Sequence, residues 1–146
     1  MRGFFRDPVN GLTHFLGAAL AVAGTVLLIL RAVEPHVRPW HVVAFAVFGA
    51  GMILLYTAST LYHWLPVGER GVRALKRLDH SMIFVYIAAT YTPICLIPLR
   101  GPWGWSIFGV IWGLALAGIF IKVFWLFAPR WLSTALYLGM GWVALV

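Results

Sequence analysis

The sequence predicts an all-α protein, a polytopic bundle of transmembrane helices, and three observations support this class. Hydrophobic residues make up 62% of the 146-residue chain and charged residues only 10%, whereas about 25% of the residues of a typical soluble domain are charged. The apolar residues fall into long runs, and a bilayer core about 30 Å thick needs roughly 20 apolar residues in a helix. Backbone groups in lipid must bond within the chain, which favours helices for such runs.

Five spans are predicted within one integral membrane domain, at about 12–30, 42–65, 81–99, 103–121 and 131–146. The first closes at Arg31, the second ends at Pro66, and the fourth is followed by Lys122. The fifth is still apolar at Val146 and has no polar flank. We therefore expect the chain to be truncated at its C-terminus and the parent protein to continue.

Basic residues are divided unevenly between the two sides of the predicted bundle. One side carries Arg2, Arg6, Arg70, Arg73, Lys76, Arg77, Lys122 and Arg130, and the other carries Arg31, Arg38 and Arg100. The positive-inside rule then places the N-terminus in the cytoplasm. The same rule explains the net charge of +7 without nucleic acid. We expect a multi-pass protein of the cell (plasma) membrane, with the lipid bilayer as its partner.

Two smaller features concern packing. Gly109-x-x-x-Gly113, continuing to Ala117, has the spacing of small residues that lets membrane helices approach closely. The single cysteine, Cys95, excludes an internal disulfide and a Cys-rich metal site. Because it lies in an apolar stretch, Cys95 is interpreted as a small buried hydrophobic residue.

Polar side chains gather where the first three spans approach the predicted cytoplasmic face. The clusters are Asn10, Thr13 and His14 at the start of the first span, Ser59 and His63 in the second, and Asp79 and His80 at the start of the third. Ser59 and His63 are four residues apart and share a helix face. The linker between the second and third spans is short and cationic, so these spans are predicted to be antiparallel neighbours. Ionisable groups at membrane depth are functional candidates.

Each residue also has a structural interpretation. His63 could be part of an interfacial triplet, Tyr62-His63-Trp64, and Asp79 could be a helix N-cap. Ser59 could bond the carbonyl one turn back, and His14 and His80 could have structural roles. The functional alternative is a zinc site, but a catalytic zinc usually takes three protein ligands. One histidine and one aspartate from adjacent helices do not complete that set.

Four segments carry a resemblance to a known family. Asp7-Pro8-Val9-Asn10-Gly11-Leu12-Thr13-His14, Ser59-Thr60-Leu61-Tyr62-His63, Leu78-Asp79-His80-Ser81 and Tyr91-Thr92-Pro93 resemble the hemolysin III family. The segment 132–142 also looks like that family's fifth span. The family belongs with the adiponectin and progestin receptors (PAQR proteins) and, more distantly, with the alkaline ceramidases.

The resemblance implies a seven-helix bundle with a cytoplasmic N-terminus. It assigns His63 as a zinc ligand, Asp79 as the residue that holds the zinc-bound water, and Ser59 as a donor to the oxyanion. Two further zinc histidines would come from an His-x-x-x-His motif in the last span, which this sequence does not contain. Zinc is therefore expected for full-length relatives, and the site in this chain is expected to be incomplete.

Three functions stay open at this point. The first is zinc-dependent hydrolysis of an amide bond in a ceramide-like lipid. The second, which the family name suggests, is cytolytic pore formation in a membrane. The third is a lipid-sensing, receptor-like role without catalysis.

Overall fold

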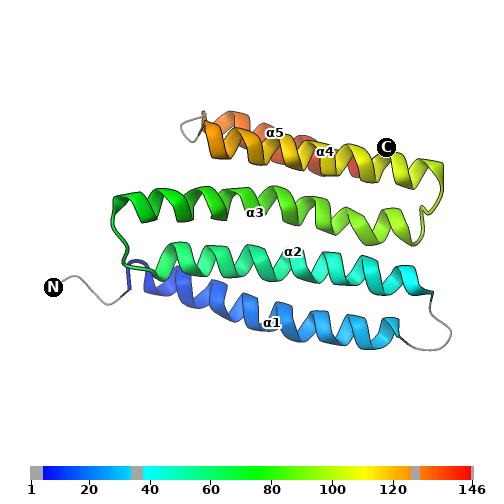
Figure 1. Ribbon diagram of the computed structural model, residues 1–146, viewed down its shortest axis with the longest axis horizontal. Coiled ribbons are helices and arrows are strands. Elements are labelled where there is room, and N and C mark those ends of the chain that lie inside the picture. Colours follow the sequence, from blue (N-terminus) through cyan, green and yellow to red (C-terminus); the bar gives the residue numbers. More distant parts are fainter. Residues whose placement is uncertain (1–4, 34–37, 126–128, 146) are drawn as a thin grey trace.

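The chain folds into an up-and-down row of helices. The computed structural model describes residues 5–33, 38–125 and 129–145. Within them lie α1 (Pro8–Ala32), α2 (Pro39–Trp64), α3 (Glu69–Leu96), α4 (Pro102–Phe124), α5 (Arg130–Trp142) and the short 3-10 helix η1 (Val143–Leu145). Figure 1 shows α1, α2 and α3 side by side in chain order, with α4 and α5 beyond α3. The described residues contain no strand, which confirms the all-α prediction.

Three helices begin earlier than the apolar runs predicted, because each starts at a proline. Pro8, Pro39 and Pro102 occupy the first turns of α1, α2 and α4. Proline is favoured there because its fixed φ suits a helix and its missing N–H would have had no partner within the helix. Two sequence-based assignments, the basic residue Arg2 and the end of the fifth span at Val146, lie outside the described residues.

The third helix extends well before the predicted third span. Helix α3 begins at Glu69, so the connection from α2 is only four residues long, and Asp79 lies inside the helix rather than at its N-terminus. The N-cap interpretation of Asp79 is therefore wrong, since Gly68 occupies that position. Arginine, lysine, alanine and leucine, which dominate this polar stretch, are good helix formers. An exposed Glu69–Arg73 ion pair of 3.5 Å, one turn apart, supports the first turn.

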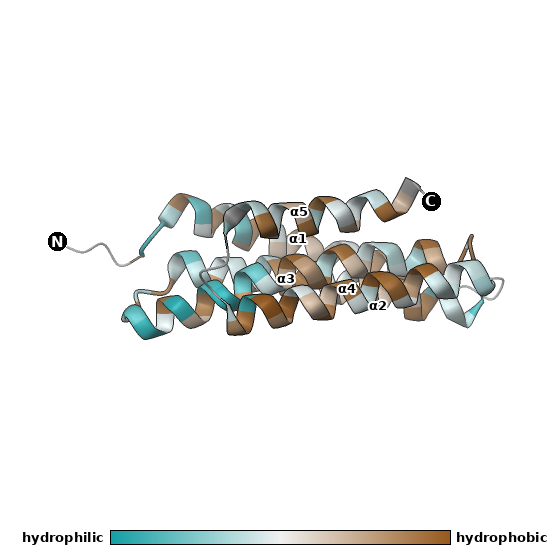
Figure 2. Cartoon of the chain, turned by 90° about the horizontal axis from the view of Figure 1, so that it is seen from above, coloured by the Kyte–Doolittle hydropathy of each residue, from teal (hydrophilic) through white to brown (hydrophobic). Residues whose placement is uncertain are grey.

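Three described helices are long and apolar enough to cross a membrane, namely α1, α2 and α4. Their mean hydropathies over the best window are 2.1, 2.0 and 2.2. The first third of α3 is charged and α5 has only 13 residues, so their crossing of the bilayer stays a prediction. Figure 2 shows hydrophilic residues concentrated at the end of the bundle nearest the N-terminus.

The outward surface of these helices is hydrophobic. Large apolar side chains such as Leu20, Leu116 and Phe124 are 74%, 65% and 72% exposed. Water would penalise apolar surface of this extent at about 25 cal/mol per Å². Lipid tails carry no such penalty, so the exposed side chains fit a bilayer environment.

The core lies between α3, α4 and α5. Its fully buried members include Phe84, Ile111 and Met140, and Cys95 is 1% exposed, which confirms its interpretation as a buried residue. The Tyr91 hydroxyl, 2.7 Å from the Met140 carbonyl oxygen and 2.8 Å from that of Gly141, donates its hydrogen to α5. This bond fastens the short fifth helix to α3.

The packing face of α4 differs from the one that the small-residue spacing predicted. A Cβ built on Gly109 or Gly113 would meet no atom of the described residues within 4 Å. A Cβ built on Gly118 would instead lie 2.3 Å from Cε1 of Phe84, so α4 approaches α3 through this glycine. The buried stripe of α4 is Gly104, Ile111, Ala115, Gly118 and Lys122. The spacing of small residues pointed to the face of α4 that carries Gly109 and Gly113, but α4 packs through the face that carries Gly118.

Lys122 also departs from the sequence-based assignment. It was counted as a loop residue after the fourth span, but α4 continues to Phe124, and Lys122 is 6% exposed. Lysine is a good helix former, and its long apolar stem packs readily along a helix surface. The end of hydrophobicity in the sequence was therefore not the end of the helix.

Candidate functional site

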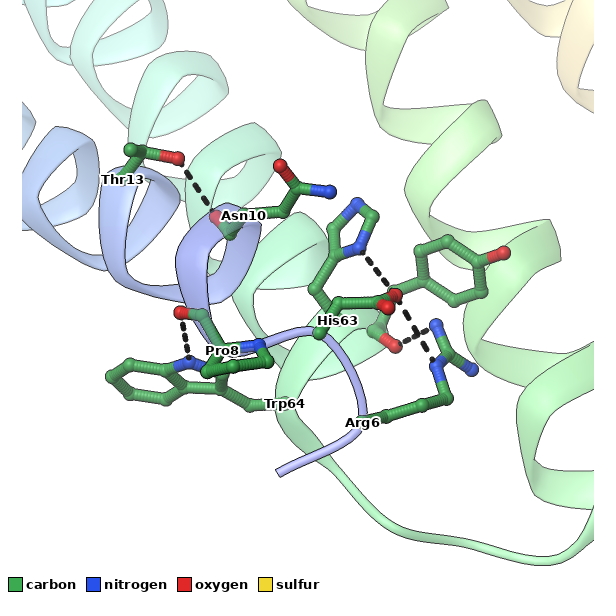
Figure 3. A network of polar contacts seen from close by, with 8 residues as sticks. Arg6, Pro8, Asn10, Thr13, His63 and Trp64 are labelled. Atoms are coloured by element: carbon green, nitrogen blue, oxygen red, sulfur yellow. Dashed lines mark hydrogen bonds and ion pairs between the residues drawn. The ribbon is translucent and has the colours of Figure 1, made fainter. Parts of the chain in front are cut away.

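The N-terminal segment before α1 docks against the last turn of α2 (Figure 3). The Asp7 backbone N–H donates to the His63 carbonyl oxygen at 2.9 Å, and the Arg6 guanidinium donates to the Tyr62 carbonyl oxygen. Carbonyls in the last turn of a helix have no partner within it. Residues 6 and 7 supply those partners and so hold the C-terminal end of α2 in place.

Two further contacts fix the first turn of α1 to the same place. The Trp64 indole N–H donates to the Pro8 carbonyl oxygen at 3.3 Å. A Cβ on Gly11 would lie 1.9 Å from Trp64 Cδ1, so the helices can approach this closely only because residue 11 has no side chain. The Arg6 guanidinium also lies 4.3 Å above the centre of the Tyr62 ring, a cation–π arrangement.

The Asp7 carboxylate is directed at His63 and not at its own helix. Asp7 is the N-cap of α1, a position where aspartate usually accepts a bond from a backbone N–H of the first turn. No such side-chain bond is present. Instead, Asp7 Oδ2 lies 3.1 Å from His63 Nδ1 and 3.6 Å from Arg6 Nε.

This contact determines which nitrogen of His63 carries the proton. An ionised carboxylate can only accept hydrogen bonds, so Nδ1 must be the donor. In the neutral imidazole, Nε2 then keeps its lone pair. The His63 side chain is 20% exposed, so it is largely enclosed. The result is an oriented histidine with one nitrogen available as an acceptor or ligand.

One residue of the first predicted cluster, His14, contacts His63. The His14 and His63 rings are stacked, with centroids 5.6 Å apart and planes within 4°. Asn10 is exposed, and Figure 3 shows its side chain on the same side of α1 as the His63 ring. Thr13 is used locally, because its hydroxyl donates to the Asn10 carbonyl oxygen at 2.9 Å.

Ser59 and the third cluster are placed differently. Ser59 is 5% exposed, one turn before His63 on α2. Asp79 and His80 lie half-buried inside α3, and the Tyr137 hydroxyl donates to the His80 carbonyl oxygen at 3.2 Å. No hydrogen bond or ion pair joins Asp79 or His80 to His63 within the described part of the chain. The structure therefore stacks His14 against His63 and places Asp79 and His80 on α3, the helix next to α2.

The described residues do not form a complete zinc site. Residues 5–33, 38–125 and 129–145 contain no group of three or more His, Cys, Asp or Glu side chains that could hold a metal ion. Stacked imidazoles have parallel ring planes, and the lone pairs in those planes do not converge on a point between the rings. Among the histidines that the structure describes, His63 is the one hydrogen-bonded to a carboxylate, as metal-binding histidines usually are. His63 fits one ligand position of such a site.

Asp7 is the member of this site that the sequence did not single out. It is 56 residues from His63 in the chain, and its place before Pro8 at the head of a span is typical of an N-cap. The nearest available signal was an acidic residue beside Arg6 at the start of a membrane span. Only the packing of α1 on α2 shows where its carboxylate points.

The fold and the site define a helical membrane protein whose polar groups meet at one end of the bundle. Comparison with known proteins gives the family. The model of the haemolysin-III related family matches residues 3–146, and the chain belongs to that family.

Two curated relatives are similar over nearly the whole chain. Hemolysin-3 of Bacillus cereus is 42% identical over 151 aligned residues, which cover 100% of this chain and 66% of the relative. The Hemolysin-3 homolog of Bacillus subtilis (strain 168) is 40% identical over 140 residues, covering 96% of this chain and 65% of that protein. The chain thus spans just under two thirds of the length of these relatives. No solved structure matches it significantly.

Proposed function

We propose that the protein hydrolyses an amide bond in a membrane lipid of the ceramide type, and that His63 is one ligand of the zinc ion that it uses. The observation that carries the proposal is the Asp7–His63 pair, 3.1 Å apart at one end of a membrane bundle. A histidine held by a carboxylate on one ring nitrogen is typical of metal centres. The enclosed position of His63, one turn from buried Ser59, supports a reaction site shielded from bulk water.

The roles follow from the chemistry of each side chain. Bound zinc lowers the pKa of a coordinated water and polarises a carbonyl. The Asp79 carboxylate would orient a water molecule or accept its proton, and the Ser59 hydroxyl would donate to the developing oxyanion. Water adds to the amide carbon and the C–N bond breaks, which gives a carboxylic acid and an amine. By the family resemblance, two further histidines would complete the zinc site.

The proposal includes a location. The basic residues before α1 and between α2 and α3 favour a cytoplasmic N-terminus in the cell membrane. The Asp7–His63 pair would then face the cytoplasmic leaflet, where a lipid amide could reach it from the headgroup region.

A second function, permeabilisation of membranes, is favoured by one observation. The relatives that cover the chain are named Hemolysin-3 and Hemolysin-3 homolog. An apolar bundle that exposes large hydrophobic side chains would insert readily into a target bilayer. This activity needs neither zinc nor Asp79.

One experiment separates the two functions. Full-length protein is reconstituted into vesicles that contain ceramide and a trapped dye, and release of fatty acid and of dye is measured together. We expect fatty acid release that a zinc chelator stops and added zinc restores, without dye leakage. Leakage that persists in chelator, with no fatty acid released, would support permeabilisation and contradict the hydrolase. Ceramide binding without either release would contradict both functions and favour lipid sensing.

A further inference from the structure

The segment formed by Arg6 and Asp7 contacts both the backbone of the last turn of α2 and the side chain of His63. The Asp7 backbone N–H donates to the His63 carbonyl oxygen and the Arg6 guanidinium donates to that of Tyr62, and these bonds hold the last turn of α2. At the side chain, the Asp7 carboxylate holds Nδ1 of the imidazole. The backbone bond helps to fix the position of His63, and the carboxylate contacts its ring at Nδ1.

The local structure makes this arrangement specific to Asp7. Asp7 makes no side-chain capping bond to the first turn of α1, so its carboxylate is available to His63. The φ and ψ of −133° and 81° at Asp7 turn the chain out of α1. Arg6 Nε lies 3.6 Å from the same carboxylate oxygen, Oδ2, so the carboxylate is held between Arg6 and His63.

We propose that Asp7 is a positioning residue, which holds His63 as the tautomer with the proton on Nδ1 and directs Nε2 towards the reaction site. Its link to zinc rests on the proposed function, but its effect on the tautomer does not. The Asp7 side chain is 46% exposed and that of His63 is 20% exposed, so the pair is partly enclosed, unlike the fully exposed ion pairs that contribute little to stability.

The test reads the tautomer directly. Full-length protein labelled with ¹⁵N-histidine is studied by NMR in lipid nanodiscs, at a pH where His63 is neutral, and its signals are assigned by their loss in His63→Gln. In the wild-type protein we expect one population, with the proton on Nδ1. In Asp7→Asn and Asp7→Ala we expect a mixture of both tautomers, since an amide can donate as well as accept and alanine can do neither. An unchanged single population in both variants would overturn the proposal.

The matched control for Asp7→Asn removes a carboxylate that lies away from His63. Glu69 is exposed and pairs only with Arg73 among the contacts described for it, so Glu69→Gln makes the same change in charge without touching His63. It should leave the His63 signals unchanged. Asp7→Asn keeps the shape of the side chain, so a result is available even if Asp7→Ala does not fold.

A second readout connects Asp7 with the metal. Zinc affinity is measured by competition with a chelator, and the Asp7→Asn variant should bind about 10–100-fold more weakly, as is typical when a partner of a metal-binding histidine is removed. If the wild-type protein binds no zinc, the proposed function fails, while the tautomer measurement still decides the role of Asp7. Equal zinc affinity in both proteins would contradict the positioning role.

Discussion

Replacing His63 by glutamine is expected to abolish zinc binding and to reduce lipid amide hydrolysis to background. The substitution removes the ring nitrogen proposed as a ligand and the Nδ1 donor that faces Asp7. Its effect should equal or exceed that of Asp79→Asn, for which the loss of a general base predicts about 10²–10⁴-fold. Ser59→Ala, which removes one donor to the oxyanion, should cost about 10²–10³-fold. Rates and zinc content are measured on purified full-length variants.

His41→Gln is the matched control for this series. His41 lies at the opposite end of α2, where its Nδ1 is 3.1 Å from the Arg38 carbonyl oxygen. The same substitution there should change neither zinc content nor rate. Thermal melting of each variant in detergent shows whether a loss of rate is a loss of folded protein. Hydrolysis at the wild-type rate in folded His63→Gln would refute the proposed site.

Gly118→Ala is expected to destabilise the bundle, although alanine is the better helix former. The new Cβ would stand 2.3 Å from Phe84, which is 0% exposed and cannot move without disturbing the core. Overpacking of this kind lowers the free energy of unfolding by about 1–3 kcal/mol. The better helix propensity of alanine raises it by at most about 1 kcal/mol. The melting temperature in detergent should therefore fall, and Gly118→Leu should lower it further.

Gly113→Ala, on the same helix, is expected to have the opposite effect on stability. A Cβ at residue 113 meets nothing within 4 Å among the described residues, so the propensity gain stands alone and the melting temperature should stay or rise. If Gly113→Ala were as harmful as Gly118→Ala, the packing face of α4 described above would be wrong. The pair thus tests the helix register independently of function.

The membrane class, the number of described helices and their order could be predicted from the sequence. Apolar runs are a direct consequence of the bilayer, and the prediction of five helices is confirmed within the described residues. Helix boundaries were less predictable. The polar first third of α3 and the extension of α4 past Lys122 are helical because helix propensity and hydrophobicity are different properties. A hydropathy pattern locates the part of a helix in lipid and not the whole helix.

The site was predicted in part. The sequence identified His63, Ser59, His14 and Asn10 as candidates at one end of the bundle, and the structure brings His14 and His63 into contact. It also grouped Asp79 with them at one depth, and that grouping stays a prediction. Residues on neighbouring helices at similar depth can still face different neighbours, because helix rotation is decided by packing.

The sequence by itself determined that this is a membrane protein, that it is helical and that it belongs to the haemolysin-III related family. Each of these depends on composition and local pattern, which the chain carries without folding. Only the tertiary structure decided that the Asp7 carboxylate holds His63 and that Gly118, not Gly113, admits the neighbouring helix. Both facts join residues that are far apart in the chain, and their contacts arise only when the helices are packed at a definite rotation and distance.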